Sequence, residues 1–255
     1  LSNLTSVGMA LHVSGNDALI SLSGLAGITN LEERLLISRN DALTNLDGLQ
    51  NLAHAKIVWI SDNNQLLHLD GLAGLTTVDE TVYIAGAQTY GNNALINIDG
   101  LSSLTTAEWV YISTPVLTNV DGLSGLTTVG TLDLRSCASL ADLTGINVDD
   151  LFVQTLRLEN MDALANLDVF SGLTGLTKLE LERNDALTSI AGLSHLSAIS
   201  SITIKDNLAL VALELSSLAT TKTLNVQDNP ALKSLGGLSQ LTSVTGTFSI
   251  EENHS

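Results

Sequence analysis

The sequence is poor in aromatic residues, cysteine and long apolar runs, and each shortage excludes something. Aromatic residues make up 3% of the 255 residues, so a buried core must be built from layers of Leu, Ile and Val. Cys137 is the single cysteine, so no disulfide can form within the chain. No uninterrupted apolar run approaches the roughly 18 residues that a membrane-spanning helix requires. We therefore expect no insertion into a membrane.

Basic residues are also scarce, with 10 Lys and Arg against 27 Asp and Glu, which gives a net charge of −17. The phosphates of nucleic acid and the headgroups of an anionic membrane would be repelled by this charge rather than neutralised. We therefore expect no nucleic-acid partner. The excess charge favours solubility of a protein with a large apolar core.

Motifs that carry catalytic chemistry are missing too. The sequence contains no nucleophile elbow, phosphate-binding loop or set of His and Cys residues at metal-ligand spacing, and its five histidines are scattered in phase with a repeat. We therefore expect no enzymatic activity and no cofactor. The chain opens on Leu1 rather than Met, as expected if a leader has been removed or if the sequence is a segment of a longer protein.

One repeated pattern, with the central motif L-x-L-x-x-N, covers most of the chain. Its repeats are 22 to 28 residues apart, and most steps are 22 to 24 residues. Repeats of this length and pattern are typical of leucine-rich repeats, which must stack into a solenoid because one unit cannot bury its apolar face alone. The position of Val13 recurs at Ile37, Ile60, Ile84, Ile112, Leu134, Leu158, Leu181, Ile204, Val226 and Ile250.

Each repeat predicts one short strand with two inward and three outward side chains. Stacking places these strands about 4.8 Å apart in a parallel sheet. An inward asparagine follows most strands, and buried asparagine must be hydrogen-bonded, so we expect a ladder of side chains that bond the backbone of neighbouring repeats. Cys137 occupies this position in its own repeat. The predicted ladder residues are Asn16, Asn40, Asn63, Asn184, Asn207, Asn229 and Asn253.

The consensus N-D-A-L-T-x-L-D-G-L-S-x-L-T-x-V, present in Asn184–Leu187 and Asp121–Val129, resembles the receptor L-domain type of leucine-rich repeat. The resemblance covers essentially the whole chain. It implies a right-handed β-solenoid with a parallel sheet on one face and little helix, at the cell surface or outside the cell. Residues 1–255 would form one continuous array of about ten repeats plus a terminal half repeat. Receptor L domains usually carry disulfide-bonded caps, which cannot form here.

An acidic or hydroxyl residue precedes the conserved glycine in most repeats. Stacked carboxylates could hold calcium, which prefers clustered oxygen ligands. We favour a capping role at a short helical turn, because Ser and Thr replace Asp at this position and are interchangeable with it as caps. The candidate calcium ligands are Asp47, Asp70, Asp99 and Asp121.

Outward strand positions between residues 36 and 111 carry most of the large apolar and aromatic side chains, which are Leu36, Ile57, Trp59, Tyr83, Trp109 and Tyr111. Contiguous exposed aromatics on a rigid sheet are typical of binding sites. A further tyrosine, Tyr90, lies in an irregular insertion at residues 85–93, and insertions in repeats often lie on the binding face. These seven residues are the candidate binding site. The alternative is that the aromatic residues only cover the sheet or pack under the insertion.

Farther along the chain, the outward positions become charged, and include Asp133, Arg135, Arg157, Glu159, Lys178, Glu180, Glu182, Arg183 and Lys205. Opposite charges on neighbouring strands form cross-strand pairs that stabilise a sheet by a few tenths of a kcal/mol each. We favour this structural role over recognition of a partner.

These observations predict an extracellular or cell-surface recognition and adhesion module that binds a protein or a glycan through the outward face of its sheet. The alternative is a structural protein that assembles end to end into a fibre or forms a segment of a larger surface protein. The second possibility arises because the first and last repeats lack the polar, atypical sequence that normally caps a solenoid.

Overall fold

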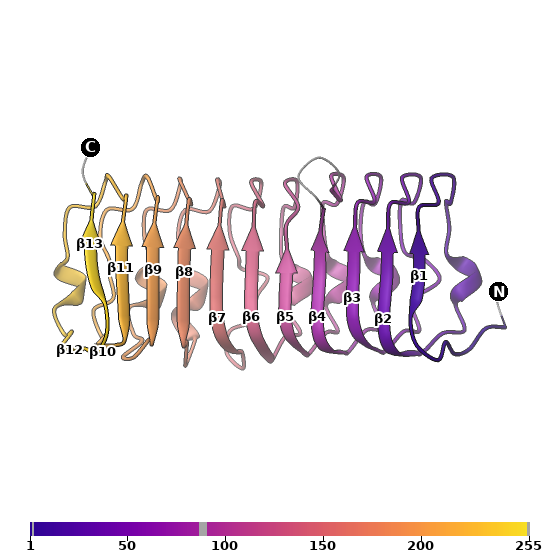
Figure 1. The fold of residues 1–255 in the computed structure, drawn as a ribbon, viewed down its shortest axis with the longest axis horizontal. Helices are drawn as coiled ribbons and strands as arrows, with labels where there is room; N and C mark the ends of the chain where they lie inside the picture. Colours follow the sequence, from indigo (N-terminus) through magenta and orange to yellow (C-terminus); the bar gives the residue numbers. More distant parts are fainter. Residues whose placement is uncertain (2, 87–90, 254–255) are drawn as a thin grey trace. The chain divides into compact units, whose positions relative to one another are not determined.

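A computed structural model describes residues 1, 3–86 and 91–253, and it is a parallel β-solenoid of about ten turns (Figure 1). Its helices are 3-10 turns of three to five residues. Within the described residues, none of the helices could cross a membrane, since each is too short. Contacts divide the chain into two compact units, Leu1–Val129 with Thr144–Asn147, and Gly130–Leu143 with Val148–Ser255. The single continuous array that the repeat predicts stays a prediction.

The first unit contains five parallel strands that follow one another in the order of the sequence. Residues one repeat apart lie in register, as in Ile37 with Ile60 and Ile60 with Ile84. This register is the one predicted from the repeat. The strands are β1 (Leu11–Ser14), β2 (Asn30–Ser38), β3 (His54–Ser61), β4 (Thr77–Ala85) and β5 (Thr106–Ile112), and the 3-10 turns are η1 (Ser23–Leu25), η2 (Asp70–Leu72), η3 (Asp99–Leu101) and η4 (Asp121–Leu123).

The second unit repeats this arrangement, again with parallel strands in sequence order and a small second sheet made of β10 and β12. Strand β6 starts two residues before the unit does. The strands are β6 (Thr128–Arg135), β7 (Phe152–Glu159), β8 (Lys178–Glu182), β9 (Ser201–Lys205), β10 (Thr220–Thr221), β11 (Thr223–Gln227), β12 (Ser243–Val244) and β13 (Phe248–Glu251). The turns are η5 (Asp168–Gly172), η6 (Ala191–Leu193) and η7 (Gly236–Leu238).

The alternation of side chains along each strand builds the core. Leu35 and Ile37 are fully buried while Leu36 between them is partly exposed, and the same alternation recurs in the neighbouring strands. The inward residues are almost all Leu, Ile and Val, and Phe170 is the largest fully buried side chain among the described residues. Each buried aliphatic side chain contributes about 1.5–3 kcal/mol, so stacked layers of aliphatic residues replace an aromatic core, as predicted.

Close stacking of successive turns explains the glycine of the D-G-L segment. A Cβ atom at Gly71 would lie 2.0 Å from the carbonyl oxygen of Leu46, and one at Gly100 would lie 1.8 Å from that of Leu69. No side chain fits at such a distance from rigid backbone. The glycine therefore allows one turn to lie directly against the turn before it.

The asparagine ladder is present, and each member is hydrogen-bonded to at least one neighbouring repeat. Asn40 donates from Nδ2 to the Val13 carbonyl at 3.0 Å, and its Oδ1 accepts from the backbone nitrogen of Asn16 at 3.2 Å. Asn92 is also a buried member, and the repeat spacing did not predict it because the insertion displaces it. Three other buried residues hold this position in the next repeats, namely Thr114, Cys137 and Met161.

The predicted capping role of the aspartates is wrong. Asp70, Asp99 and Asp121 are the first residues of their 3-10 turns, and those turns have no side-chain cap. At two of these turns the aspartate is a donor instead: its backbone nitrogen donates a hydrogen bond to the side chain of an asparagine two residues earlier. The two residues involved are Asn97, at 3.4 Å, and Asn119, at 3.1 Å. This is an Asx-type turn, which leaves the aspartate carboxylates pointing to solvent.

Candidate functional site

Three aromatic residues on consecutive strands of the first unit stack on one another, and we call them the aromatic ladder. Trp59 on β3 pairs in register with Tyr83 on β4, which pairs with Tyr111 on β5. The ring centroids of Trp59 and Tyr83 are 3.8 Å apart with an interplanar angle of 16°, and those of Tyr83 and Tyr111 are 4.9 Å apart at 6°. The rings therefore form one surface, as the sequence predicted.

The spacing of the sheet produces this stack. Neighbouring strands lie about 4.8 Å apart, which is close to the distance at which parallel aromatic rings attract each other. Residues two positions farther along the strands are small, and Ser61 is 7% exposed although its side chain points outward. Trp59 donates from Nε1 to Ser61 Oγ at 3.2 Å, so the indole ring is held against this small residue.

Trp109 lies beside the ladder in an edge-to-face contact with Tyr111, with ring centroids 5.9 Å apart at 76°. It is 38% exposed, and the three ladder residues are half-buried. Burial raises the pKa of Tyr83, and the nearby Tyr111 and Asp62 raise it further. The Tyr83 hydroxyl therefore keeps its proton at neutral pH and remains a hydrogen-bond donor.

The predicted apolar neighbours also lie on this face. Leu36 pairs in register with Trp59, and Ile57 and Trp109 are both paired with Thr81 on β4. The side chains of Leu36 and Ile57 are half-buried. We call the ladder together with Leu36, Ile57 and Trp109 the aromatic patch. The seventh predicted residue, Tyr90, lies outside the described residues. That the patch binds a ligand stays a prediction.

A row of acidic side chains, which the sequence reasoning missed, lies at the beginning of the same strands. Lys56 Nζ lies 3.4 Å from Glu80 Oε1 and 3.7 Å from Glu33 Oε2, and these two carboxylates raise the pKa of Lys56. Register shifts in the pairing of β2, β3, β4 and β5 interrupt the simple alternation, so period-two counting does not find these residues. We call Glu32, Glu33, Asp79, Glu80 and Glu108 the acidic row.

The side chains of the four aspartates considered for calcium are not placed to form a metal site. Burial raises the pKa of Asp99, and the charges of Asp121 and Asp70 raise it further, as expected for a row of like charges. Across residues 1, 3–86 and 91–253, no three His, Cys, Asp or Glu side chains are placed to hold a metal ion together. Asp47, the first of the four aspartates along the chain, accepts a hydrogen bond at Oδ1 from Gln50 Nε2 at 3.2 Å.

In the second unit, the outward positions form a network of ion pairs centred on Asp133. Its side chain is fully buried and accepts from Arg135 Nε at 2.7 Å and from Arg157 Nη1 at 3.3 Å. The predicted cross-strand pairing is therefore confirmed. Further pairs join Arg135 with Glu159, Arg157 with Glu180, Lys178 with Glu180, and Arg183 with Glu159. We call these seven residues the charged face.

Burial by itself would raise the pKa of Glu180, but hydrogen bonds from Arg157 and Lys178 outweigh it and hold the pKa below its ordinary value of 4.5. Burial also lowers the pKa of Arg157, and the contacts with Glu180 and Asp133 more than reverse this effect. Both groups are charged at neutral pH. The network therefore satisfies its own charges, which favours a structural role.

Comparison with known proteins adds a likeness of fold to solved structures. The chain is similar to an internalin, InlF, from Listeria monocytogenes, with 19% sequence identity and a TM-score of 0.48, over 96% of this chain and 75% of the other. No family model matches the sequence, and no curated protein matches it. The repeat pattern and the structure together define a leucine-rich-repeat solenoid.

Proposed function

We propose that this chain is a non-enzymatic recognition module that binds a protein partner through the aromatic patch. The observation that carries the proposal is the gathering of both tryptophans and two of the three tyrosines of an aromatic-poor chain on one outward face of a parallel sheet. Aromatic side chains are enriched at the energetic centres of protein interfaces. A rigid sheet also holds them in place before binding, which lowers the entropic cost of association.

The stacking favours a protein over a glycan as the ligand. A sugar ring binds an aromatic side chain through the open face of the aromatic ring. Both faces of Tyr83 are covered, one by Trp59 and one by Tyr111, at centroid distances of 3.8 and 4.9 Å. The ladder presents ring edges and hydroxyl groups, which suit the mixed apolar and polar contacts of a protein surface.

Two further features belong to the same proposal. We assign the repeats to the receptor L-domain type, because the consensus of Asp121–Val129 and its siblings resembles that type. A location at the cell surface or outside the cell follows from this assignment. No cofactor is required, since binding through the patch involves no bond making or breaking.

The experiment that tests this function uses an array of purified extracellular protein domains and a glycan array, both probed with the native chain. Trp59→Ala should weaken binding to any protein found by tens of fold, because truncating such an anchor costs about 2 kcal/mol or more. Thr203→Ala, on the outward face of β9 in the second unit, is the matched control and should bind like the native chain. Partners whose affinity is unchanged by Trp59→Ala, or partners found only among the glycans, would contradict the proposal.

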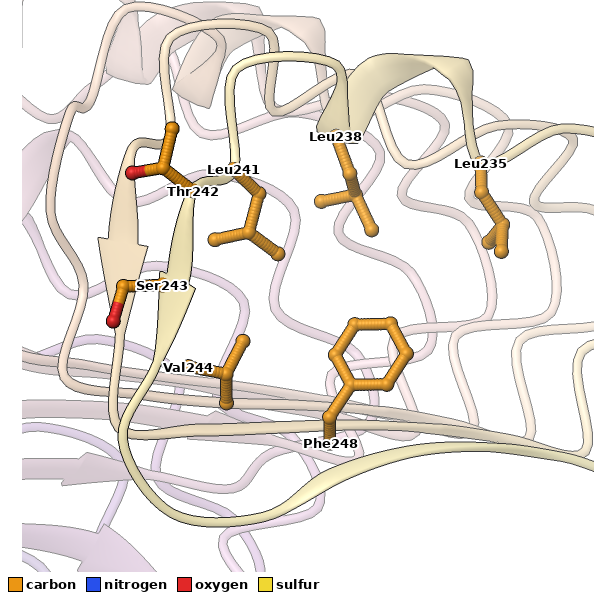
Figure 2. A pocket seen from close by; sticks show the side chains of 7 residues that line it. All are labelled: Leu235, Leu238, Leu241, Thr242, Ser243, Val244 and Phe248. Atoms are coloured by element: carbon orange, nitrogen blue, oxygen red, sulfur yellow. The ribbon is translucent and has the colours of Figure 1, made fainter.

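End-to-end assembly is the second candidate, and the exposed apolar end of the second unit favours it. A hollow of about 370 Å³ opens there, and Figure 2 shows its lining side chains, among them Leu235, Leu238, Leu241 and Phe248. Phe248 is 52% exposed and Leu235 43%. A second copy could cover this surface, and so could further repeats of a longer polypeptide.

The molar mass in solution, measured by light scattering over a range of concentrations, tests this candidate. Association through this surface predicts oligomers that grow with concentration, and Phe248→Lys should dissolve them because it places a charge in the contact. Phe248 is already half-exposed, so the substitution should leave the fold intact by circular dichroism. A native chain that stays monomeric at high concentration contradicts self-association.

A further inference from the structure

The acidic row flanks the aromatic patch, and the two features together specify the chemistry of the partner. We propose that the patch binds a basic protein segment, which packs apolar side chains against the ring edges and places Lys or Arg side chains on Glu80 and Glu108. This inference rests on the function proposed above. It adds the charge of the partner and the residues that recognise that charge.

The charge of the first unit supports a basic partner. Residues 1–129 contain twelve Asp and Glu and three Lys and Arg, so their formal charge is 3 − 12 = −9. Of the three cations, Lys56 already lies between Glu33 and Glu80. The other two, Arg34 and Arg39, belong to the repeat of β2, away from Glu108 on β5.

Glu108 is the residue of the row with the clearest need for a partner. It is exposed, it directly precedes Trp109, and no ion pair joins it to a cation in the described part of the chain. Glu80 is half-exposed and is shared with one lysine only. Both carboxylates are therefore available to cations that arrive with a ligand, and complementary charge of this kind governs specificity and the rate of association.

The geometry relates the charges to the rings. Glu80 precedes Tyr83 by three residues on β4, and Glu108 precedes Tyr111 by three residues on β5. A strand rises about 3.3 Å per residue, so each carboxylate lies roughly 10 Å along the sheet from a ladder ring. An extended segment alternates its side chains between two faces, so it meets both features when a basic residue stands two or four positions from its apolar anchor.

Intrinsic fluorescence reads out this site alone, because Trp59 and Trp109 are the two tryptophans of the chain. The probes are two synthetic twelve-residue peptides with the same Phe and Leu anchors, one with Lys and the other with Glu four positions from each anchor. The lysine peptide should give a saturable change with a Kd at least about tenfold lower than that of the glutamate peptide. Its affinity should fall several-fold between low and high salt, since exposed charges are screened.

Two double variants assign the effect to the acidic row. Glu80→Gln with Glu108→Gln should weaken binding of the lysine peptide by about fivefold or more and should remove most of its salt dependence. Glu182→Gln with Glu251→Gln removes the same charge from the second unit and should leave the Kd unchanged. Circular dichroism of both variants checks that the fold is retained.

Equal affinities for the two peptides, or tighter binding of the glutamate peptide, would overturn the inference of a basic partner. The proposed function would survive that result if Trp59→Ala abolished the binding of both peptides. Absence of a saturable response to either peptide would also overturn the inference, whereas the protein array still decides the proposed function. A double variant of the acidic row that binds the lysine peptide like the native chain would reject Glu80 and Glu108 as the recognising residues.

Discussion

The outward columns of the two units are built on the same scaffold and use opposite chemistry. In the first unit, Trp59, Tyr83 and Tyr111 stack and remain half-exposed. In the second unit, the corresponding column holds Asp133, Arg157 and Glu180, which bond one another. Inward positions are the same in both, with layers of Leu and Ile and stretches of the asparagine ladder. The repeat therefore fixes the core and leaves the outward face free to vary.

The difference is the reason for proposing the aromatic patch, and not the charged face, as the binding surface. The carboxylate of Asp133 is enclosed by two guanidinium groups, and breaking such a network to bind a ligand would leave buried charge without a partner. The aromatic ladder loses nothing when a partner covers its edges, because burying apolar surface is favourable. Exposed aromatic residues therefore indicate a binding surface better than a satisfied network of charges does.

The strongest test of this comparison is Asp133→Ala, which should lower the free energy of unfolding by about 3 kcal/mol. The substitution leaves Arg135 and Arg157 close together without the carboxylate that both bond. Urea denaturation followed by circular dichroism measures the change. Asp162→Ala, at an exposed turn position of the same unit, is the control and should stay within about 0.5 kcal/mol of the native chain. A loss of less than about 1 kcal/mol would show that the network is not structural.

The asparagine ladder should be equally important in both units, so the contrast should be confined to the outward columns. Asn40→Ala in the first unit and Asn207→Ala in the second should each cost about 1–3 kcal/mol of unfolding free energy, because each leaves backbone groups of a neighbouring repeat unpaired. Thermal and urea melts measure both. Neither substitution should change ligand affinity per folded molecule, and a variant that melts like the native chain would contradict the ladder.

The smallest expected effect is on the pH dependence of the charged face. The folded pKa of Glu180 is held below its ordinary value of 4.5, so its contribution is present above about pH 4.5 and is lost as the pH falls through the folded value. Glu180→Gln should therefore be less stable than the native chain by about 1 kcal/mol at pH 6, and the difference should vanish at strongly acidic pH. Urea melts at both pH values measure it. A difference that persists unchanged in acid would show that Glu180 acts through packing and not through its charge.

Much of the candidate site could be predicted from the sequence, because the repeat fixes the register. Once Ile60, Ile84 and Ile112 were aligned, Trp59, Tyr83 and Tyr111 had to fall in one outward column. The acidic row could not be predicted in this way. Glu80 and Glu108 lie within segments where the strand register shifts. At such a point, counting alternate residues no longer tells which face of the sheet a side chain is on.

The sequence by itself determined the repeat, the aliphatic core, the asparagine ladder and the neighbours within each outward column, since all of these follow from a period of about 23 residues and the alternation of side chains along a strand. Tertiary structure alone decided that the aromatic rings stack face to face, that Asp133 is enclosed by two arginines, and that the aspartates of the D-G-L segment do not cap their turns. The reason is that a repeat fixes which backbone positions are neighbours. Side-chain torsions and competing hydrogen-bond partners decide how those neighbours meet.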